Sequence, residues 1–81
     1  MNHIDEAKQQ LGKNLKRILT KKRVLKSEVI SLKQQAKALA DYDAKFNPLF
    51  SRITTQVNGM KSELNEDRRS KLEAIWQEYF N

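Results

Sequence analysis

Residues 11–39 read LGKNLKRILTKKRVLKSEVISLKQQAKAL. Apolar residues recur along this stretch at alternating spacings of four and three. Since an α-helix turns once per 3.6 residues, this spacing predicts one apolar seam on one side of a helix. The seam comprises Leu11, Leu15, Ile18, Lys22, Leu25, Val29, Leu32, Ala36 and Leu39. So narrow a seam is typical of a coiled coil, which needs a partner helix lying nearly parallel or antiparallel to it.

The seam lies in a segment that predicts one long helix from about residue 4 to about residue 45. Between Lys13 and Phe46 the chain has neither glycine nor proline. The helix is expected to stop before Pro48, because a residue that precedes proline is disfavoured in the α region. Asn47 is suited to an N-cap and Pro48 to a first helical position, so we expect a turn at residues 46–47 and a second helix over about 48–80.

The second helix has two positions at which it could break. Asn58-Gly59 normally indicates a turn, and Asn65 could cap a separate third helix. The apolar register of Phe50, Ile53, Val57, Met60 and Leu64 continues through Asn58-Gly59 and slips only after Leu64. A continuous helix with a shift of phase explains this pattern too, and it is the interpretation we favour.

The two helices are expected to fold into an all-α, antiparallel helical hairpin that forms a single domain over residues 1–81. In the register that matches the two seams, Lys22 lies near Asp67 and makes a polar layer midway along the hairpin. A two-helix core is thin and leaves one side of each seam exposed to solvent. We therefore expect two hairpins to pair, as a homodimer, into a coiled-coil-like four-helix bundle.

Positive charge is concentrated in the first half of the chain. The net charge is +6; eleven Lys/Arg and five Asp/Glu lie in residues 1–46, whereas residues 47–81 hold five of each. Such an asymmetry favours an anionic partner, and the first helix is expected to bind the phosphate backbone of DNA or RNA. The residues expected to do so are Lys16, Arg23, Lys26, Lys33 and Lys37. The other interpretation is a solvated face that confers solubility. No aromatic residue lies among these cations, so the sequence gives no support for base stacking.

Aromatic residues at the turn and near residue 80 suggest a different function, that of a protein-binding adaptor or inhibitor of the kind that phages encode. The residues that would bind a protein partner are Phe46, Leu49 and Phe50 at the turn, and Trp76, Tyr79 and Phe80 at the end of the second helix. Exposed aromatic residues are enriched at binding hot spots. Alternatively, the second group closes the open end of the bundle beside Leu11 and Leu15.

Neither an enzyme nor a metal, cofactor or small-molecule site is expected. The chain has no cysteine, and its one histidine, His3, lies in a stretch expected to be frayed. No hydroxyl residue has a neighbouring base to activate it. The first residues do not resemble a signal peptide, and no apolar run approaches the ~20 residues that span a bilayer, so we expect a soluble, cytoplasmic protein without a membrane partner.

The stretch Ala44-Lys45-Phe46-Asn47-Pro48-Leu49-Phe50 resembles the Ala-Arg-Phe-Asp-x-x-Leu-Phe stretch of the primosomal replication-restart PriC family. It is one residue shorter than that stretch, and it covers about a tenth of the chain. No fold, function or residue role is carried over from it.

Overall fold

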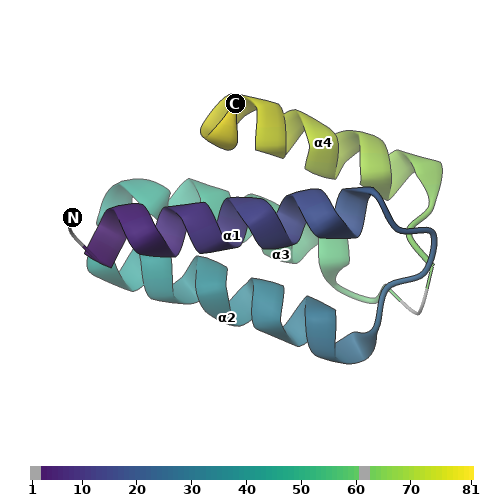
Figure 1. Ribbon diagram of the computed structural model, residues 1–81, viewed down its shortest axis with the longest axis horizontal. Coiled ribbons are helices and arrows are strands. Elements are labelled where there is room, and N and C mark those ends of the chain that lie inside the picture. Colours follow the sequence, from purple (N-terminus) through teal and green to yellow (C-terminus); the bar gives the residue numbers. More distant parts are fainter. Residues whose placement is uncertain (1–2, 61–62) are drawn as a thin grey trace.

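The computed structural model describes residues 3–60 and 63–81, which form four α-helices packed against each other (Figure 1). The elements are α1 (His3–Leu19), α2 (Lys26–Tyr42), a short 3₁₀ turn (Ala44–Phe46), α3 (Asn47–Val57) and α4 (Glu66–Phe80). Within these described residues there is no strand beyond one isolated β-bridge between Arg23 and Glu63. The predicted all-α class is confirmed.

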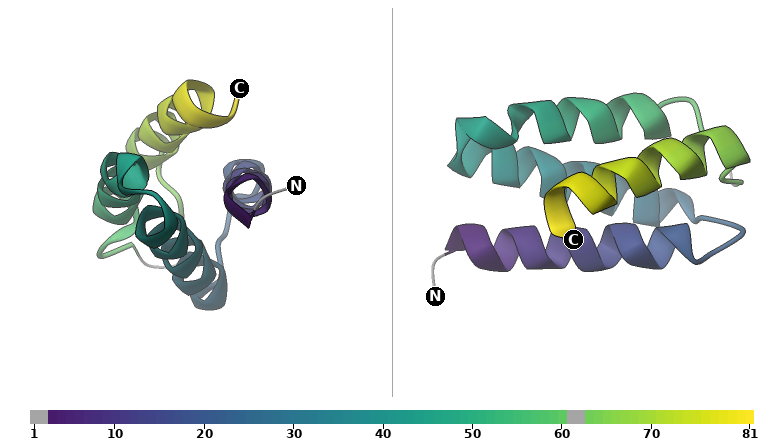
Figure 2. Two further views of the ribbon diagram at one scale, coloured as in Figure 1. Left: turned by 90° about the vertical axis from the view of Figure 1, so that its left-hand side faces the viewer. Right: turned by 90° about the horizontal axis from the view of Figure 1, so that it is seen from above.

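The four helices form a closed ring around one core. Each helix packs against the next along the chain, and α4 packs back against α1, while the diagonal pairs α1/α3 and α2/α4 are not in contact. Successive helices run antiparallel, and α4 crosses α1 obliquely (Figures 1 and 2). The fully buried side chains come from all four helices: Leu11, Leu15, Leu32, Leu39, Leu49, Ile53, Leu72 and Ile75. One chain thus supplies every wall of its core.

The predicted continuous helix over residues 4–45 is wrong, because the chain leaves α1 at Leu19 and turns back into α2 at Lys26. The last turn of α1 tightens: the amide of Lys21 donates to the carbonyl of Ile18, three residues earlier. In the loop, Val24 is buried, whereas the seam residue Leu25 is 64% exposed. Folding back lets the two halves of the seam bury each other, which a single extended helix cannot do.

Glu28 fixes the start of α2 after this loop. Its carboxylate accepts from the amide of Leu25 at 3.0 Å and from the ammonium of Lys21 at 2.6 Å. The bond from Lys21, followed by the bond from Leu25, holds the pKa of Glu28 below its ordinary value of about 4.5. A carboxylate in the first helical turn that binds the N-cap amide is half of a capping box, so this residue marks a helix start that the apolar periodicity concealed.

The predicted continuity of the second helix is also wrong, because α3 ends at Val57 and α4 begins at Glu66. Both alternative breaks occur. Gly59 has a φ of 72°, a left-handed conformation that favours glycine. The side chain of Asn65 accepts from the amide of Arg68 at 2.8 Å and so caps α4.

The turn around residue 46 is where the sequence predicted it, with different details. The helix before the turn, α2, ends at Tyr42, and the carboxylate of Asp43 caps the 3₁₀ turn by accepting a hydrogen bond from the amide of Lys45. Asn47 is not the N-cap, because it already has helical dihedrals (φ −57°, ψ −43°); Pro48 lies in the first turn of α3, as expected.

The loop over residues 20–25 lies beside the described loop residues 58–60 and 63–65 at one end of the molecule, where the sequence predicted a polar layer inside a long hairpin (Figure 1). Lys22 and Asp67 are both exposed, and Asp67 pairs with Lys71 at 3.1 Å, so that layer is wrong. A homodimer was expected because a two-helix core would be open on one side. In this fold α3 and α4 cover α1 and α2, so that reason is absent.

Two consecutive arginines of α4 hold this end together. Arg69 donates to the carbonyls of Leu19 and Lys21, just past the end of α1. Arg68 donates to the carbonyls of Gln56 and Asn58 at the end of α3. The last carbonyls of a helix have no partner within it, so these guanidinium groups satisfy acceptors that would otherwise be left open.

We predict that Arg69→Ala lowers the free energy of unfolding by about 1.5–3 kcal/mol, because two carbonyls lose a charged donor at a site where the arginine side chain is only 23% exposed. The measurement is urea denaturation. Lys71→Ala on the same helix is the control; it breaks only an exposed ion pair and should cost at most about 1 kcal/mol. Equal losses for the two variants would contradict the role given to Arg69.

Candidate nucleic-acid interface

The described cations after Lys37 are all engaged in interactions within the fold. Lys45 pairs with Asp43 at 3.7 Å, Arg52 with Glu78, and Lys71 with Asp67, while Arg68 and Arg69 bind carbonyls. The hydrogen bond with Glu78 raises the pKa of Arg52, so this guanidinium stays charged. The charges of these cations are therefore used in contacts within the fold.

Most cations from Lys13 to Lys37, by contrast, form no ion pair with a described residue. Of the ten cations between Lys8 and Lys37, only Lys21 has an acidic partner among the residues that the structure describes. Lys8 and Lys16 lie over aromatic rings. The side chains without a described ion pair or ring contact are those of Lys13, Arg17, Lys22, Arg23, Lys26, Lys33 and Lys37. The charge asymmetry of the sequence therefore becomes an asymmetry of unneutralised charge in the fold.

Four of the five predicted phosphate contacts lie on the loop and on α2. Arg23 is in the loop, and Lys26, Lys33 and Lys37 follow on α2 at spacings of seven and four, which place them on one flank. Gln35 faces α1, where it accepts from the side-chain amide of Asn14 at 2.5 Å. Residues two positions before and after it point roughly the opposite way, since each position turns the helix by about 100°. The α2 lysines therefore face away from α1.

Lys16 does not join this group. It lies on α1, with its Nζ 4.1 Å from the centre of the Trp76 ring on α4, and α4 is not in contact with α2. The sequence placed Lys16 beside the other four residues because it assumed a single continuous helix.

The residues of the alternative, protein-binding interpretation are largely packed. Phe46 is 5% exposed and Leu49 is fully buried, so the turn between α2 and α3 does not present them to a partner. Phe50 is half-buried against the core. Trp76, Tyr79 and Phe80 are half-buried as well. Trp76 and Phe80 lie against Gly12 of α1, whereas the ring of Tyr79 is 5.8 Å from the guanidinium of Arg52 on α3.

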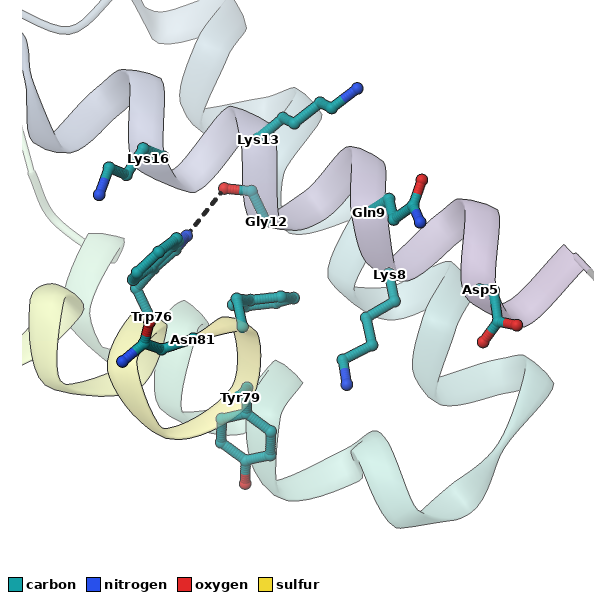
Figure 3. A pocket seen from close by; sticks show the side chains of 10 residues that line it. Asp5, Lys8, Gln9, Gly12, Lys13, Lys16, Trp76, Tyr79 and Asn81 are labelled. Carbon is teal, nitrogen blue, oxygen red and sulfur yellow. Dashed lines mark hydrogen bonds between the residues drawn. The ribbon is translucent and has the colours of Figure 1, made fainter.

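Gly12 allows this close approach of α4 to α1. The Nε1 of Trp76 donates to the carbonyl of Gly12 at 3.1 Å (Figure 3). A Cβ at position 12 would lie 2.8 Å from Cδ1 of Phe80, which is closer than real side chains allow. The sequence showed Gly12 only as a weak point in a helix, whereas the fold uses it as a contact surface for an aromatic residue.

A groove of about 730 Å³ runs between α1 and α4 beside this contact (Figure 3). Lys8, Lys13 and Lys16 line it from α1. Its other wall holds the three aromatic residues of α4, Trp76, Tyr79 and Phe80. One interpretation of the sequence placed these aromatic residues beside Leu11 and Leu15, but it did not join them to the lysines, because the two sets come from opposite ends of the chain.

Within residues 3–60 and 63–81, no three His, Cys, Asp or Glu side chains gather closely enough to hold a metal ion. None of the described helices combines the length and the apolar character needed to cross a bilayer. Comparison of the chain with protein-family models, curated proteins and solved structures gave no match. The candidate sites are therefore interpreted from their geometry.

We predict that Gly12→Ala destabilises the protein, although alanine favours a helix by about 1 kcal/mol over glycine. The added methyl group forces the Phe80 ring to move, and overpacking of this kind costs about 1–3 kcal/mol. Urea denaturation of Gly12→Ala alone and in a Phe80→Ala background separates the two effects. In that background the same change should stabilise, and stabilisation by Gly12→Ala alone would contradict the close approach.

Proposed function

We propose that this protein is a non-enzymatic accessory factor that binds the phosphate backbone of nucleic acid through Arg23, Lys26, Lys33 and Lys37. The observation that supports this is the division of the cations described above. Those after Lys37 are engaged within the fold, whereas these four have no acidic partner among the described residues. A fold that leaves its positive charge unneutralised on one element is suited to an anionic polymer.

The geometry of α2 supports contact with several phosphates at once. From Lys26 to Lys37 the helix rises about 16 Å, at 1.5 Å per residue, and Arg23 extends the row into the loop. Lysine ammonium groups act as point charges on flexible stems, so they follow a phosphate backbone without reading bases. The proposed binding therefore has little sequence preference.

The adaptor alternative has less support from the packing. Two of its six residues, Phe46 and Leu49, are in the core. Its other candidates near residue 80 line the α1/α4 groove, whose lysines also favour an anionic ligand.

The test compares two variants that lose the same charge. Lys26→Gln/Lys37→Gln removes two cations with no acidic partner, and Lys45→Gln/Lys71→Gln removes two that pair with Asp43 and Asp67. All four lysines are exposed, so both variants should fold. Binding of labelled DNA and RNA oligonucleotides is measured by fluorescence anisotropy from about 50 mM salt upward, where purely electrostatic binding is detectable.

We expect the slope of log affinity against log salt to fall by roughly 1.4–1.8 in Lys26→Gln/Lys37→Gln, since each phosphate contact contributes about 0.7–0.9. The control variant should keep nearly the parent slope. Equal losses in both variants would show that only net charge matters and would overturn the assignment to α2. No binding by the parent at ~50 mM salt would overturn the function itself.

A further inference from the structure

We propose that the α1/α4 groove binds a segment of single-stranded nucleic acid, with a base stacked beside Trp76 and phosphates held by Lys8 and Lys16. This inference rests on the proposed function and deepens it: α2 supplies backbone contacts that any nucleic acid satisfies, and the groove adds a contact that only an unpaired base can make.

The groove brings together the two kinds of side chain that bind single strands. Such sites combine cations that follow the backbone with aromatic rings on which bases stack. Here Lys16 already lies over the indole of Trp76, with 4.1 Å between its Nζ and the ring centre. This cation–π contact is replaceable: an entering base can take the ring face, and the displaced ammonium can bind the adjoining phosphate.

The charge of the groove favours an anionic occupant. Lys8 and Lys16 direct their ammonium groups toward α4, whereas that of Lys13 points away from it (Figure 3), and Asp5 is the one carboxylate side chain among the lining residues. Figure 3 places Asp5 toward the opposite end of the groove from Trp76, so the positive charge of Lys16 lies beside the indole. The carboxylates of an acidic peptide would satisfy the lysines equally well, but Asp and Glu side chains offer no flat ring to the indole, whereas every nucleotide carries both an anionic group and a flat ring.

The stacking surface is held in place before any ligand binds. The bond from Nε1 of Trp76 to the carbonyl of Gly12 fixes the indole against α1. Because the ring is already ordered, a base that stacks on it meets a smaller entropic cost than it would on a mobile side chain. The groove volume, about 730 Å³, is within the range of small-ligand sites and suits one or two nucleotides.

A single strand fits this arrangement better than a duplex. In a duplex, both faces of a base are covered by its neighbours, and a base reaches an aromatic side chain only after it leaves the stack. The groove should therefore distinguish the two forms, whereas the α2 lysines should not.

The experiment uses the intrinsic fluorescence of Trp76, the one tryptophan in the chain. The unmodified protein is titrated with an oligothymidylate of about 20 nucleotides and, separately, with a short hairpin duplex of the same number of phosphates. We expect strong quenching of the indole by the single strand and little change with the duplex, although the anisotropy of labelled DNA shows that both bind.

Two variants test the residues. Trp76→Leu should weaken binding of the single strand at least about fivefold and leave duplex binding unchanged, as expected for the loss of one stacked base. Tyr42→Leu is the matched control, because Tyr42 is an aromatic residue on α2, 60% exposed and outside the groove. Since Trp76→Leu also removes the bond to Gly12, Lys8→Gln/Lys16→Gln provides a second variant that keeps the indole; it should reduce the quenching at a given concentration of single strand.

The outcomes separate this inference from the proposed function. Equal binding of both forms with unchanged indole fluorescence would overturn the groove site and leave the phosphate-binding function standing. No binding of either form would overturn both. An oligoglutamate peptide that quenches Trp76 as strongly as the single strand would overturn base stacking in favour of an acidic peptide ligand.

Discussion

The guanidinium of Arg69 is the contact on which the rest of the fold depends. It lies in the first turn of α4 and donates to the carbonyls of Leu19 and Lys21, where α1 has ended and the chain turns back. The hydroxyl of Thr20 donates to the carbonyl of Arg17 in the last turn of α1, but the carbonyls of Leu19 and Lys21 need a donor from elsewhere. Its neighbour Arg68 does the same for the end of α3. One turn of α4 thus closes both loops and brings α4 against α1, which completes the ring around the core.

This arrangement divides the cations of the chain between two tasks. Arg52, Arg68 and Arg69 join helices or cap their ends, and Lys45 and Lys71 make local ion pairs. Lys21 in the first loop pairs with Glu28, but Arg23, Lys26, Lys33 and Lys37 make no described ion pair, so their charge remains available to a ligand. The groove beside Gly12 adds an aromatic surface to the same charge. The two proposed sites together would combine a general affinity for phosphates with a preference for unpaired bases.

The sequence predicts part of this architecture, and the failures have physical causes. Pro48 and the apolar periodicity correctly give the turn near residue 46 and the core positions Leu32, Ala36, Leu39, Ile53 and Val57, but not the buried Leu49. Gly59 and Asn65 indicated a break in the second predicted helix, but the continuous apolar register favoured the prediction of an unbroken helix. The break at residues 20–25 contains neither glycine nor proline, and the seam runs through it unbroken at Lys22 and Leu25. It is held locally by Glu28, which the periodicity concealed, and by Arg69, which lies far along the chain, and local patterns cannot show the second contact.

The sequence likewise predicts only part of the candidate sites. The excess of positive charge was visible in the sequence, but which cations are paired depends on tertiary contacts. The meeting of Lys16 with Trp76 required α4 to pack on α1, and it depends on a glycine whose role is invisible without its neighbour Phe80. Where the sequence grouped Lys16 with the α2 lysines, the fold places it with the aromatic residues instead.

The most direct test of the account asks whether the chain folds back between α1 and α2. The side chains of Asn14 and Gln35 are hydrogen-bonded at 2.5 Å, whereas in one continuous helix they would be about 32 Å apart at 1.5 Å per residue. The chain has no cysteine, so the variant Asn14→Cys/Gln35→Cys has one pair of thiols. With a short bis-maleimide crosslinker, which bridges thiols at the distance of two hydrogen-bonded side chains, we expect a link within each monomer, seen as faster migration on a denaturing gel at every protein concentration. Unlinked monomer, or crosslinked dimers alone, would contradict the fold and restore the long hairpin.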